Sequence, residues 1–422
     1  MKCTRRRCAV PRQSHRQSHR QSHRVGPTPV GVTLLAVAVF ASGCTFAASR
    51  KVDPAATLPA MQRPAAAAPS AARSIPASPA TSVAAPPSAA AARSWPPRAP
   101  ADAPRELAAG SDPAALPAPV LIADRDNNRL VVVSPQGQVL WLWPQPGDLA
   151  PGQTFRVPDD AFFTPDGKHI VVTQEDDFVI TEIDIATRKI VWRYGVPGVH
   201  GSGPNRLWNP DDAMMLSDGS IIVADIKNCR LVRLGVAANS PLWTAGAPGS
   251  CRHSPPTRYG SPNGVFPLPN GHFLVTEINN DWVDEIDLTG HVSWSAHPPQ
   301  VSYPSDTSQL SAGEYVTADY SSVGQVVVFD AGGHTVWRWR QQSGAGRLNH
   351  PSLAEGIPNG DIILNDDRNH RVIVIDPRIN RIVWQYGHTA VRGSAPGYLS
   401  NPDGLDLVPP HSFADRVMAG GS

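Results

Sequence analysis

The stretch Asn209–Trp243, which reads NPDDAMMLSDGSIIVADIKNCRLVRLGVAANSPLW, contains the unit from which the rest of the chain is built. It opens with Pro and two acidic residues, continues through a short apolar run and turns at Asp218-Gly219. A second apolar run, an Asp/Asn/Arg segment, a third run and a final run with Trp243 complete it. Short runs rich in Val and Ile that are joined by Asp-Gly turns are typical of hairpin-linked β-strands. The unit therefore predicts four antiparallel strands in succession.

Three markers of this unit repeat in the same order along the chain. The Trp marker recurs at spacings of 51, 51, 51, 43 and 47 residues. A Pro followed by a polar residue opens each unit, and an Asp/Asn-rich segment lies between these two markers. A regular repeat of four strands, arranged radially, forms a β-propeller, so we predict an all-β fold with six blades. The residues expected to pack between the blades are Trp141, Trp192, Trp243, Trp294, Trp337 and Trp384.

The two ends of the repeat region complement each other. The chain enters at Val120–Val133 with a second and a third strand but no first, and it leaves at Asp403–Val408 with a first strand alone. Pairing of these segments would remove the free edges that an open sheet exposes. We therefore predict a propeller over residues 119–410 that is closed by its C-terminal strand, followed by a tail over residues 411–422.

Two sequence patterns in this region resemble known repeats. The pattern PDD…DGSIIVADIKNCR resembles NHL repeats, and IDIATRKIVWRYG and IDPRINRIVWQYG resemble the outer hairpin of PQQ-type propeller repeats. Together the resemblances cover about 290 residues. They imply the propeller but no particular activity, because such folds host both enzymes and binding modules.

The N-terminal segment has the features of an export signal. Residues 1–24 are basic, and Val30–Ala41 is an uncharged apolar stretch of 12 residues. A stretch of this length fits the core of a signal peptide, whereas about 18 apolar residues are needed to span a bilayer. Ala41-Ser42-Gly43-Cys44 resembles the lipobox of bacterial lipoproteins, which implies lipidation of Cys44 after processing of residues 1–44. Ordinary cleavage, giving a secreted protein, is the alternative.

Residues 45–118 are dominated by Ala, Pro and Ser, so we expect a disordered linker that buries too little apolar surface to fold. Residues 1–118 carry 15 Lys or Arg against 4 Asp or Glu, and the remaining residues carry 22 against 32. An acidic folded region repels a phosphate backbone, so nucleic acid is not an expected partner. The expected protein is an extracytoplasmic monomer that touches the membrane through its lipid alone.

The long connections all fall on one face of the predicted ring. If the first strand of each blade begins on the top face, the links between blades and the loops between second and third strands lie there too. Loops longer than about 12 residues in a compact fold are often functional. We therefore expect the top face to bind a protein, a glycan or a small polar ligand. These connections are Pro144–Val157, Tyr194–Asn209, Ala245–Ser261 and Tyr386–Asn401.

Polar side chains open the six predicted inner strands. Directed into one channel, they could hold Ca²⁺ through oxygen ligands or hydrogen-bond a small polar ligand. Alternatively, they satisfy backbone amides where the strands begin. Asp159, Asp211 and Asp403 are the candidate Ca²⁺ ligands, and the sequence predicts no other cofactor. The predicted ligand-binding residues are Asp159, Asp160, Asp211, Asp212, Asn263, Asp306 and Asp403, with Ser305 and Ser352 in the same ring.

A second set of polar residues follows the second strand of each unit. In four units Asn follows an acid three positions later (Asn127, Asn228, Asn280 and Asn369), and in three of these Arg comes after it (Arg129, Arg230 and Arg371), which indicates a repeated brace of the loop. The acids and the amide are Asp124, Gln174, Asp225, Glu277, Asp319 and Asp366. Cys229 and Cys251 lie in loops on the same face, so a disulfide is expected in an exported protein, with two free thiols as the alternative.

Two functions are compatible with these patterns. A binding module without catalysis is favoured, and a divalent-metal-dependent hydrolase or lyase with its site in the channel is the alternative. The sequence contains no HExxH zinc pattern, no GxSxG nucleophile elbow and no P-loop, so no catalytic residue is assigned.

Overall fold

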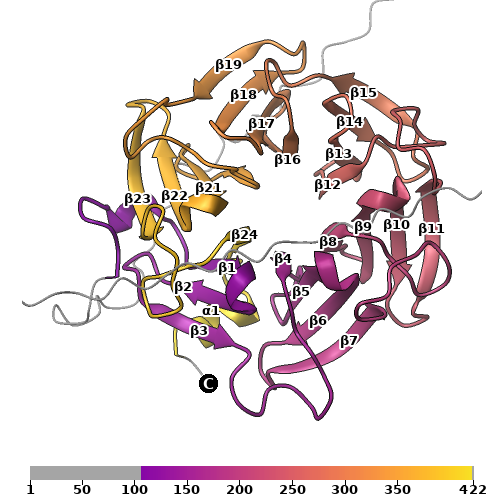
Figure 1. Ribbon diagram of the computed structural model, residues 1–422, viewed down its shortest axis with the longest axis horizontal. Coiled ribbons are helices and arrows are strands. Elements are labelled where there is room, and N and C mark those ends of the chain that lie inside the picture. The colour runs from indigo at the N-terminus through magenta and orange to yellow at the C-terminus, as the bar shows by residue number, and fades with distance from the viewer. Residues whose placement is uncertain (1–105, 421–422) are drawn as a thin grey trace, which may run out of the picture. The chain divides into compact units, whose positions relative to one another are not determined.

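The computed structural model describes residues 106–420, which form six four-stranded antiparallel sheets around a common axis (Figure 1). The first strand of each sheet lies nearest the axis, and together these inner strands form a ring around it. The predicted six-bladed β-propeller is confirmed. The predicted leader, the lipidation at Cys44 and most of the predicted linker lie outside the described residues.

The strands are given from the inner to the outer edge of each blade. Blade 1 contains β24 (Pro402–Leu407), β1 (Val120–Asp124), β2 (Arg129–Val133) and β3 (Val139–Trp143). Blade 2 contains β4 (Pro158–Phe163), β5 (His169–Gln174), β6 (Val179–Asp184) and β7 (Lys189–Gly195). Blade 3 contains β8 (Pro210–Met215), β9 (Ser220–Asp225), β10 (Arg230–Gly235) and β11 (Ser240–Gly246). Blade 4 contains β12 (Pro262–Pro267), β13 (Phe273–Glu277), β14 (Trp282–Ile286) and β15 (Val292–Ala296). Blade 5 contains β16 (Pro304–Ser311), β17 (Glu314–Asp319), β18 (Gln325–Asp330) and β19 (Thr335–Trp339). Blade 6 contains β20 (Ala354–Gly356), β21 (Ile362–Asp366), β22 (Arg371–Asp376) and β23 (Arg381–Gly387).

Short helical turns occupy some of the connections. Four of them follow the second strand of a blade and therefore lie on the face where the inner strands begin. These are η2 (Arg125–Asn127), η3 (Glu175–Asp177), η4 (Ile226–Asn228) and η5 (Asp367–Asn369); η1 (Pro113–Ala115) precedes β1, and the helix α1 (Phe413–Met418) follows β24. No helix in the described part of the chain is long and apolar enough to cross a membrane.

The ring closes as the sequence predicts. β24 pairs antiparallel with β1, with Val120 opposite Leu407 and Asp124 opposite Pro402. The amide of Val408 also donates to the carbonyl of Pro119 at 2.9 Å. Blade 1 is thus built from the two ends of the folded region, and β24 covers the edge of β1 that would otherwise be unpaired.

The Asp-Gly turns form as the sequence predicts, as blade 3 illustrates. Gly219 adopts a φ of +80°, which glycine reaches without steric cost. The carboxylate of Asp218 accepts a hydrogen bond from the amide of Ser220 at 3.0 Å. Gly219 thus supplies the backbone conformation that the turn needs, and Asp218 supplies the hydrogen-bond acceptor.

The tryptophans of the outer strands tie neighbouring blades together. Trp384 is fully buried, and its indole Nε1 donates to the carbonyl of Pro135 in blade 1 at 2.9 Å. Trp294 donates in the same way to the carbonyl of Ala331 in blade 5 at 2.8 Å. For Trp294 and Trp384 the expected packing between blades is confirmed, because each indole N–H finds an acceptor in the next blade.

The folded region begins earlier than the composition predicts. Residues 106–118 lie along β23, where the amide of Asp112 donates to the carbonyl of Val383 at 2.7 Å and that of Ala108 donates to Gln385 at 3.1 Å. Leu116 is 2% exposed. The end of the Ala/Pro-rich segment is therefore ordered because an outer edge strand offers it hydrogen bonds and an apolar surface. The C-terminal tail also packs, since Ala414 and Met418 of α1 are buried.

Candidate functional site

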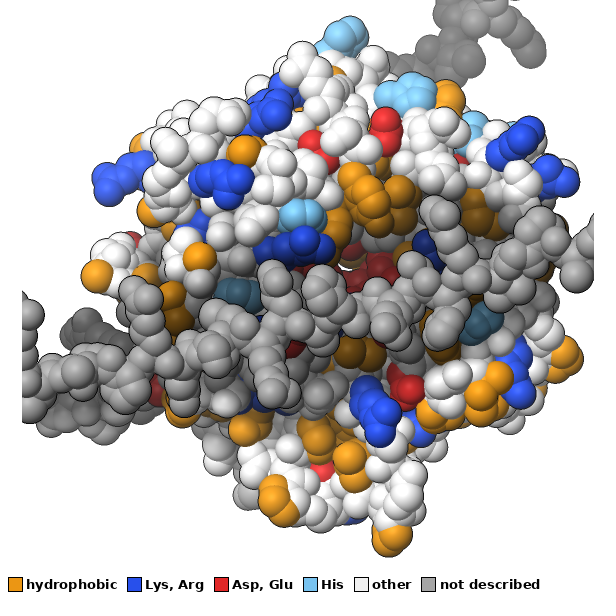
Figure 2. All heavy atoms as spheres, in the orientation of Figure 1, with side chains coloured by type: hydrophobic (Ala, Val, Ile, Leu, Met, Phe, Trp, Pro, Cys, Tyr) orange, Lys and Arg blue, Asp and Glu red, His pale blue; other side chains and the backbone are white. Residues whose placement is uncertain are grey.

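The candidate site is the central channel, which acidic side chains line where the inner strands begin. Figure 2 shows acidic side chains inside the central opening of the face in view, with basic and histidine side chains near its edge. The loops between blades and the turns η2 to η5 meet at the end of the channel where the inner strands start, as expected from the strand order. The channel thus combines charge with the longest loops of the molecule.

Arg125 of η2 reaches over the start of the inner strands and contacts four carboxylates. Its guanidinium pairs with Asp159 of β4 and lies 3.4 Å from Asp403 Oδ2 of β24. It also lies 2.8 Å from Glu175 Oε2 and 2.9 Å from Asp176 Oδ2 of η3. The Arg125 side chain is 11% exposed. One buried cation therefore joins blades 1 and 2 at the mouth of the channel.

A second group of carboxylates lies beside this one. One oxygen from each of Asp160, Asp211 and Asp306 lies within 4.8 Å of the other two, and these residues are 3%, 7% and 1% exposed. Within residues 106–420, Asp160 Oδ1 and Asp306 Oδ1 have no hydrogen-bond partner, and no ion pair to a basic residue forms at any of the three. Burial, and then repulsion from neighbouring carboxylates, raises the pKa of all three well above its usual range.

Other members of the predicted ring satisfy backbone and side-chain groups. Asp212 Oδ2 accepts from the amide of Val265 in the next blade at 2.7 Å, and desolvation raises the pKa of Asp212 to about 7. Asn263 Nδ2 donates to Asp211 Oδ2 at 2.6 Å and to Ser305 Oγ at 3.3 Å. Asp212 Oδ2 thus serves a backbone amide, as the alternative interpretation expects. Asp160 Oδ1, Asp212 Oδ1 and Asp306 Oδ1 have no hydrogen-bond partner within residues 106–420, and that interpretation does not describe them.

The expected Ca²⁺ ligands are not the set that the structure brings together. Asp159 and Asp403 both contact Arg125, and Asp403 belongs to neither channel group of three carboxylates within residues 106–420. Those groups are Asp160, Asp211 and Asp306, and Asp159, Glu175 and Asp211. Arg125 and Glu175 escaped the sequence analysis because they lie in loops outside the repeated strand positions. Arg125 lies in the run ADRDNNR and Glu175 in the run TQEDDF, and the repetition of such runs indicates a loop brace rather than a binding site.

The group of Asp160, Asp211 and Asp306 has the geometry and chemistry of a hard-cation site. Oxygens that bind one Ca²⁺ at about 2.4 Å can lie up to about 4.8 Å apart, which the three carboxylates satisfy. An all-oxygen donor set favours Ca²⁺ or Mg²⁺ over softer metals. The cation would offset charge that the described residues leave without a basic partner.

The predicted loop brace is present in blades 1, 3 and 6. In blade 3, Asp225 Oδ2 accepts from Asn228 Nδ2 at 2.8 Å and from Arg230 Nε at 2.7 Å. The same contacts recur at Asp124 and Asp366. These acids are therefore structural, as the sequence indicated.

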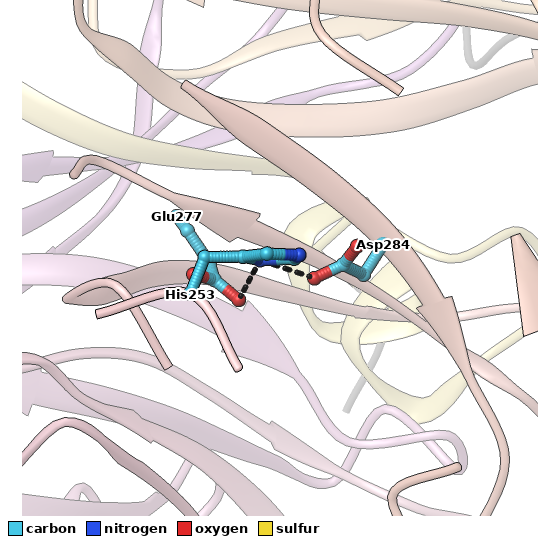
Figure 3. Close-up of side chains that lie close together, drawn as sticks. All are labelled: His253, Glu277 and Asp284. Atoms are coloured by element: carbon cyan, nitrogen blue, oxygen red, sulfur yellow. Dashed lines mark hydrogen bonds and ion pairs between the residues drawn. The ribbon is translucent and has the colours of Figure 1, made fainter. Parts of the chain in front are cut away.

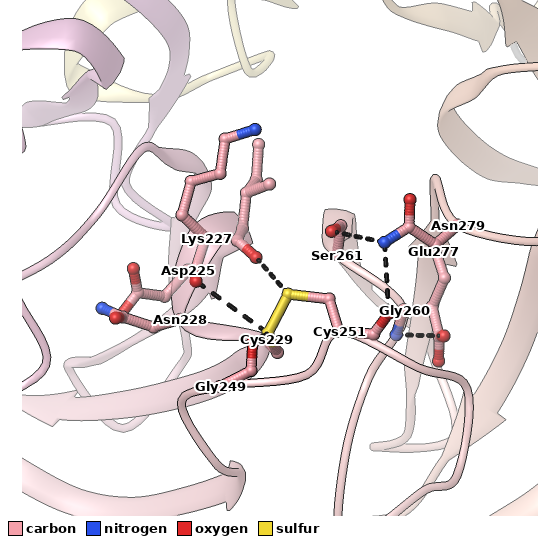
Figure 4. The surroundings of a disulfide bond; sticks show 11 residues. Asp225, Lys227, Asn228, Cys229, Gly249, Cys251, Gly260, Ser261, Glu277 and Asn279 are labelled. Carbon is pink, nitrogen blue, oxygen red and sulfur yellow. Dashed lines mark hydrogen bonds between the residues drawn. A yellow bond between two sulfur atoms is a disulfide. The ribbon is translucent and has the colours of Figure 1, made fainter. Parts of the chain in front are cut away.

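The structure joins Cys229 and Cys251 in a disulfide, 22 residues apart in the chain (Figure 4). Cys229 follows η4 in blade 3, and Cys251 lies in the long connection to blade 4. The bond therefore fixes one of the long loops of the candidate binding face. Free thiols, the alternative left open by the sequence, are not what the structure contains.

We expect Glu355→Gln to stabilise the protein at pH 8 and to leave its stability at pH 4.5 nearly unchanged. Desolvation, and then the charges of Asp406 and Asp212, raises the pKa of Glu355 to about 8. The folded state thus holds a proton that the unfolded chain releases above about pH 4.5, so stability falls as the pH rises towards 8. The gain should be on the order of 2 kcal/mol in urea denaturation at pH 8. Glu314→Gln, whose carboxylate contacts Ser311 in an exposed turn, is the control, and equal effects would contradict this assignment.

No protein-family model and no curated protein matches this chain. Similar solved structures include a protein of unknown function from Bacteroides caccae, with a TM-score of 0.48 and 14% identity over 68% of this chain and 98% of that chain. Streptogramin B lyase has a TM-score of 0.41 and 17% identity over 56% of this chain and 69% of that chain. The WD40 β-propeller domain of Doa1 has a TM-score of 0.43 and 12% identity over 67% of this chain and 81% of that chain. At identities this low, the likeness concerns the chain trace alone.

Proposed function

We propose that this chain is a non-catalytic binding module that holds Ca²⁺ in its central channel and takes a small polar ligand on the loop-bearing face. The observation that carries the proposal is the group of Asp160, Asp211 and Asp306, whose oxygens lie within 4.8 Å of one another. Three buried carboxyl groups at this separation must take up protons or share a cation, because like charges at short range in a desolvated site are costly. Bound Ca²⁺ would remove that cost at neutral pH.

Aromatic side chains beside the channel support a binding role for this face. The rings of Tyr303 and Tyr320 lie 5.5 Å apart, and Tyr320 packs edge-on against His350 with centroids 4.9 Å apart. Tyr303 precedes β16 and Tyr320 follows β17, so both stand where the inner strands of the propeller begin. All three are partly exposed. Partly exposed aromatic rings next to a cation offer both stacking and coordination to a ligand that carries hydroxyl or carboxylate oxygens.

Calcium titration of the full chain, stripped of metal with a chelator, tests the proposal. We expect one Ca²⁺ site in isothermal titration calorimetry, a higher melting temperature with Ca²⁺, and stronger binding at pH 8 than at pH 5 because the ion displaces protons. Asp306→Asn should weaken the affinity by about 100-fold, since it removes a ligand charge from the site. Asp330→Asn changes an exposed carboxylate of the same blade and should have no effect.

Two results would overturn parts of this proposal. Equal Ca²⁺ binding by the Asp306→Asn variant and the unchanged protein would exclude the channel as the site. Turnover of a ligand that binds this face, dependent on the bound ion, would replace the binding module with the hydrolase or lyase alternative.

A further inference from the structure

Blade 4 differs from blades 1, 3 and 6 at the start of its third strand. In blades 1, 3 and 6 an Asp at the end of the second strand faces an Arg directly across the sheet, as in the pair Asp225 and Arg230. The corresponding cross-strand pair in blade 4 is Glu277 and Trp282. The guanidinium that neutralises the buried acid in three blades is therefore replaced by an indole, which carries no charge.

A second departure adds another acid to the same place. Two residues beyond the Arg position, blades 1, 3 and 6 carry the buried apolar residues Val131, Val232 and Ile373, whereas blade 4 carries Asp284. Asp284 and Glu277 are both fully buried. Blade 4 thus buries two carboxyl groups where blades 1, 3 and 6 each bury one carboxylate with its arginine. Such a pair is costly unless it shares a proton or a cation compensates it.

His253 lies between these two acids (Figure 3). Its Nδ1 is 3.2 Å from Glu277 Oε1 and 3.4 Å from Asp284 Oδ2, and these ligand atoms all lie within 4.8 Å of one another. Within residues 106–420, Glu277 and Asp284 form ion pairs with His253 and with no other residue. The His253 side chain is 20% exposed, so the group is reached from solvent on the histidine side.

The remaining oxygen of each acid is held by the protein. The amide of Gly260 donates to Glu277 Oε2, and Ser295 Oγ donates to Asp284 Oδ1. Glu277 Oε1 and Asp284 Oδ2 are thereby directed towards the imidazole, and Asp284 Oδ2 has no hydrogen-bond partner within the described part of the chain. Outer contacts that orient one oxygen and leave the other free are typical of carboxylate metal ligands.

We propose that His253, Glu277 and Asp284 form a transition-metal site, with Zn²⁺ as the ion of best fit. One imidazole nitrogen and two carboxylate oxygens suit Zn²⁺ better than Ca²⁺, which prefers oxygen ligands alone. Three protein ligands leave a fourth tetrahedral position for water or an added ligand. The site is separate from the channel group, with which it shares no residue, and it does not depend on the proposed function.

The disulfide positions the histidine. Cys251 stands two residues before His253, and its bond to Cys229 ties this loop to blade 3 (Figure 4). Asn279 Nδ2, in the connection after Glu277, donates to the carbonyl of Cys251 at 3.2 Å. The loop that supplies the imidazole is therefore fixed to the strand end that supplies one carboxylate. Cys229 and Cys251 act as positioning residues for this site.

Stacking around Trp282 fixes the ring of the histidine. The rings of His253 and Trp282 lie 4.1 Å apart at an interplanar angle of 12°, and His297 packs on Trp282 at 3.8 Å. The Nδ1 atom of His297 contacts the carbonyl of Asp281 at 2.9 Å. Trp282 thus takes the position of the arginine and holds the imidazole over the two acids.

Zn²⁺ titration of the chelator-treated full chain, in the presence of Ca²⁺, tests this proposal. We expect one Zn²⁺ site in excess of the calcium site, and Co²⁺ in its place should give the visible absorption of a four-coordinate ion. His253→Ala should weaken Zn²⁺ binding by about 100-fold or more. Trp282→Arg should do the same with the fold retained, because it restores the charge pair of blades 1, 3 and 6. The double change of Cys229→Ser and Cys251→Ser should weaken binding by about 10-fold without abolishing it, since all three ligands remain.

His272→Ala is the matched control. Its Nδ1 lies 2.6 Å from Glu285 Oε1 in the same blade, but among residues 106–420 this pair belongs to no group of three possible metal ligands. Zn²⁺ binding should be unchanged in this variant. Equal Zn²⁺ affinity and equal Co²⁺ spectra in the unchanged protein, His253→Ala and Trp282→Arg would overturn the proposal, and so would the absence of any Zn²⁺ site beyond the calcium site.

Discussion

Deletion of residues 402–422 should leave a chain that no longer unfolds cooperatively and that aggregates at micromolar concentration. The deletion removes β24, which supplies the inner strand of blade 1. It exposes the backbone edge of β1 inside the channel and removes Leu405, which is fully buried. An unpaired edge strand with buried apolar faces is a template for pairing between chains. Circular dichroism during heating and size-exclusion chromatography measure both effects.

A shorter deletion provides the control. Removal of residues 410–422 keeps β24 but takes away α1, with its buried residues Ala414 and Met418. This variant should lose about 2–4 kcal/mol of stability, yet keep a single cooperative transition. A synthetic peptide of residues 402–420 should restore cooperative unfolding to the longer deletion. A monomeric, cooperatively unfolding protein without β24 would show that closure does not stabilise the ring.

The fold could be predicted from the sequence because each blade repeats the same pattern of strands, turns and tryptophans. Alternating apolar runs, Asp-Gly turns such as the one at Gly219, and a tryptophan on each outer strand are local signals, and six copies reinforce one another. Ring closure could be predicted for the same reason, because the N-terminal unit lacks a first strand and the C-terminal unit supplies a first strand alone. Repetition therefore conveys the architecture without any knowledge of long-range contacts.

The candidate sites were less predictable because they depend on residues that break the repeat. Arg125 has no equivalent in the aligned positions, and its contacts with Asp159 and Asp403 join segments far apart in the sequence. Trp282 and Asp284 differ from the Arg and apolar residues at the same positions of blades 1, 3 and 6, and this difference is visible in the sequence. The sequence does not show that His253, from a distant loop, contacts Glu277 and Asp284. Packing in three dimensions, rather than periodicity, decides which acids meet.

The order of residues 106–118 could not be read from composition either. This segment has the Ala and Pro content of the linker before it, but it lies on the outer edge of β23 and hydrogen-bonds to it. The segment is ordered because the edge strand β23 offers it hydrogen bonds, and the composition of the segment itself carries no information about that neighbour. Composition predicts whether a segment can fold alone and says little about whether a neighbour orders it.

Arg125→Met should destabilise the protein by about 3–5 kcal/mol at pH 8. The guanidinium is the basic partner of Asp159, Glu175 and Asp403, and its removal leaves these acids buried side by side. Loss of one partner from a buried ion pair costs more than the pair contributes, because the remaining charge stays desolvated. Urea denaturation at pH 8 and pH 5 measures the loss.

The deficit of this variant should shrink at pH 5. Burial already raises the pKa of Glu175 and Asp403, and Arg125 lowers both, so its removal raises them further. A carboxyl group with a raised pKa in the folded state costs stability as the pH rises from about 4 through its folded value, and the cost is absent when both states are protonated. Arg378→Met is the control, because Arg378 also pairs with two acids, Asp361 and Asp376, but is 64% exposed. That variant should lose less than about 1 kcal/mol at either pH. Equal losses in the two variants, or a loss in Arg125→Met that does not depend on pH, would contradict the role of Arg125 as the buried cation of the channel mouth.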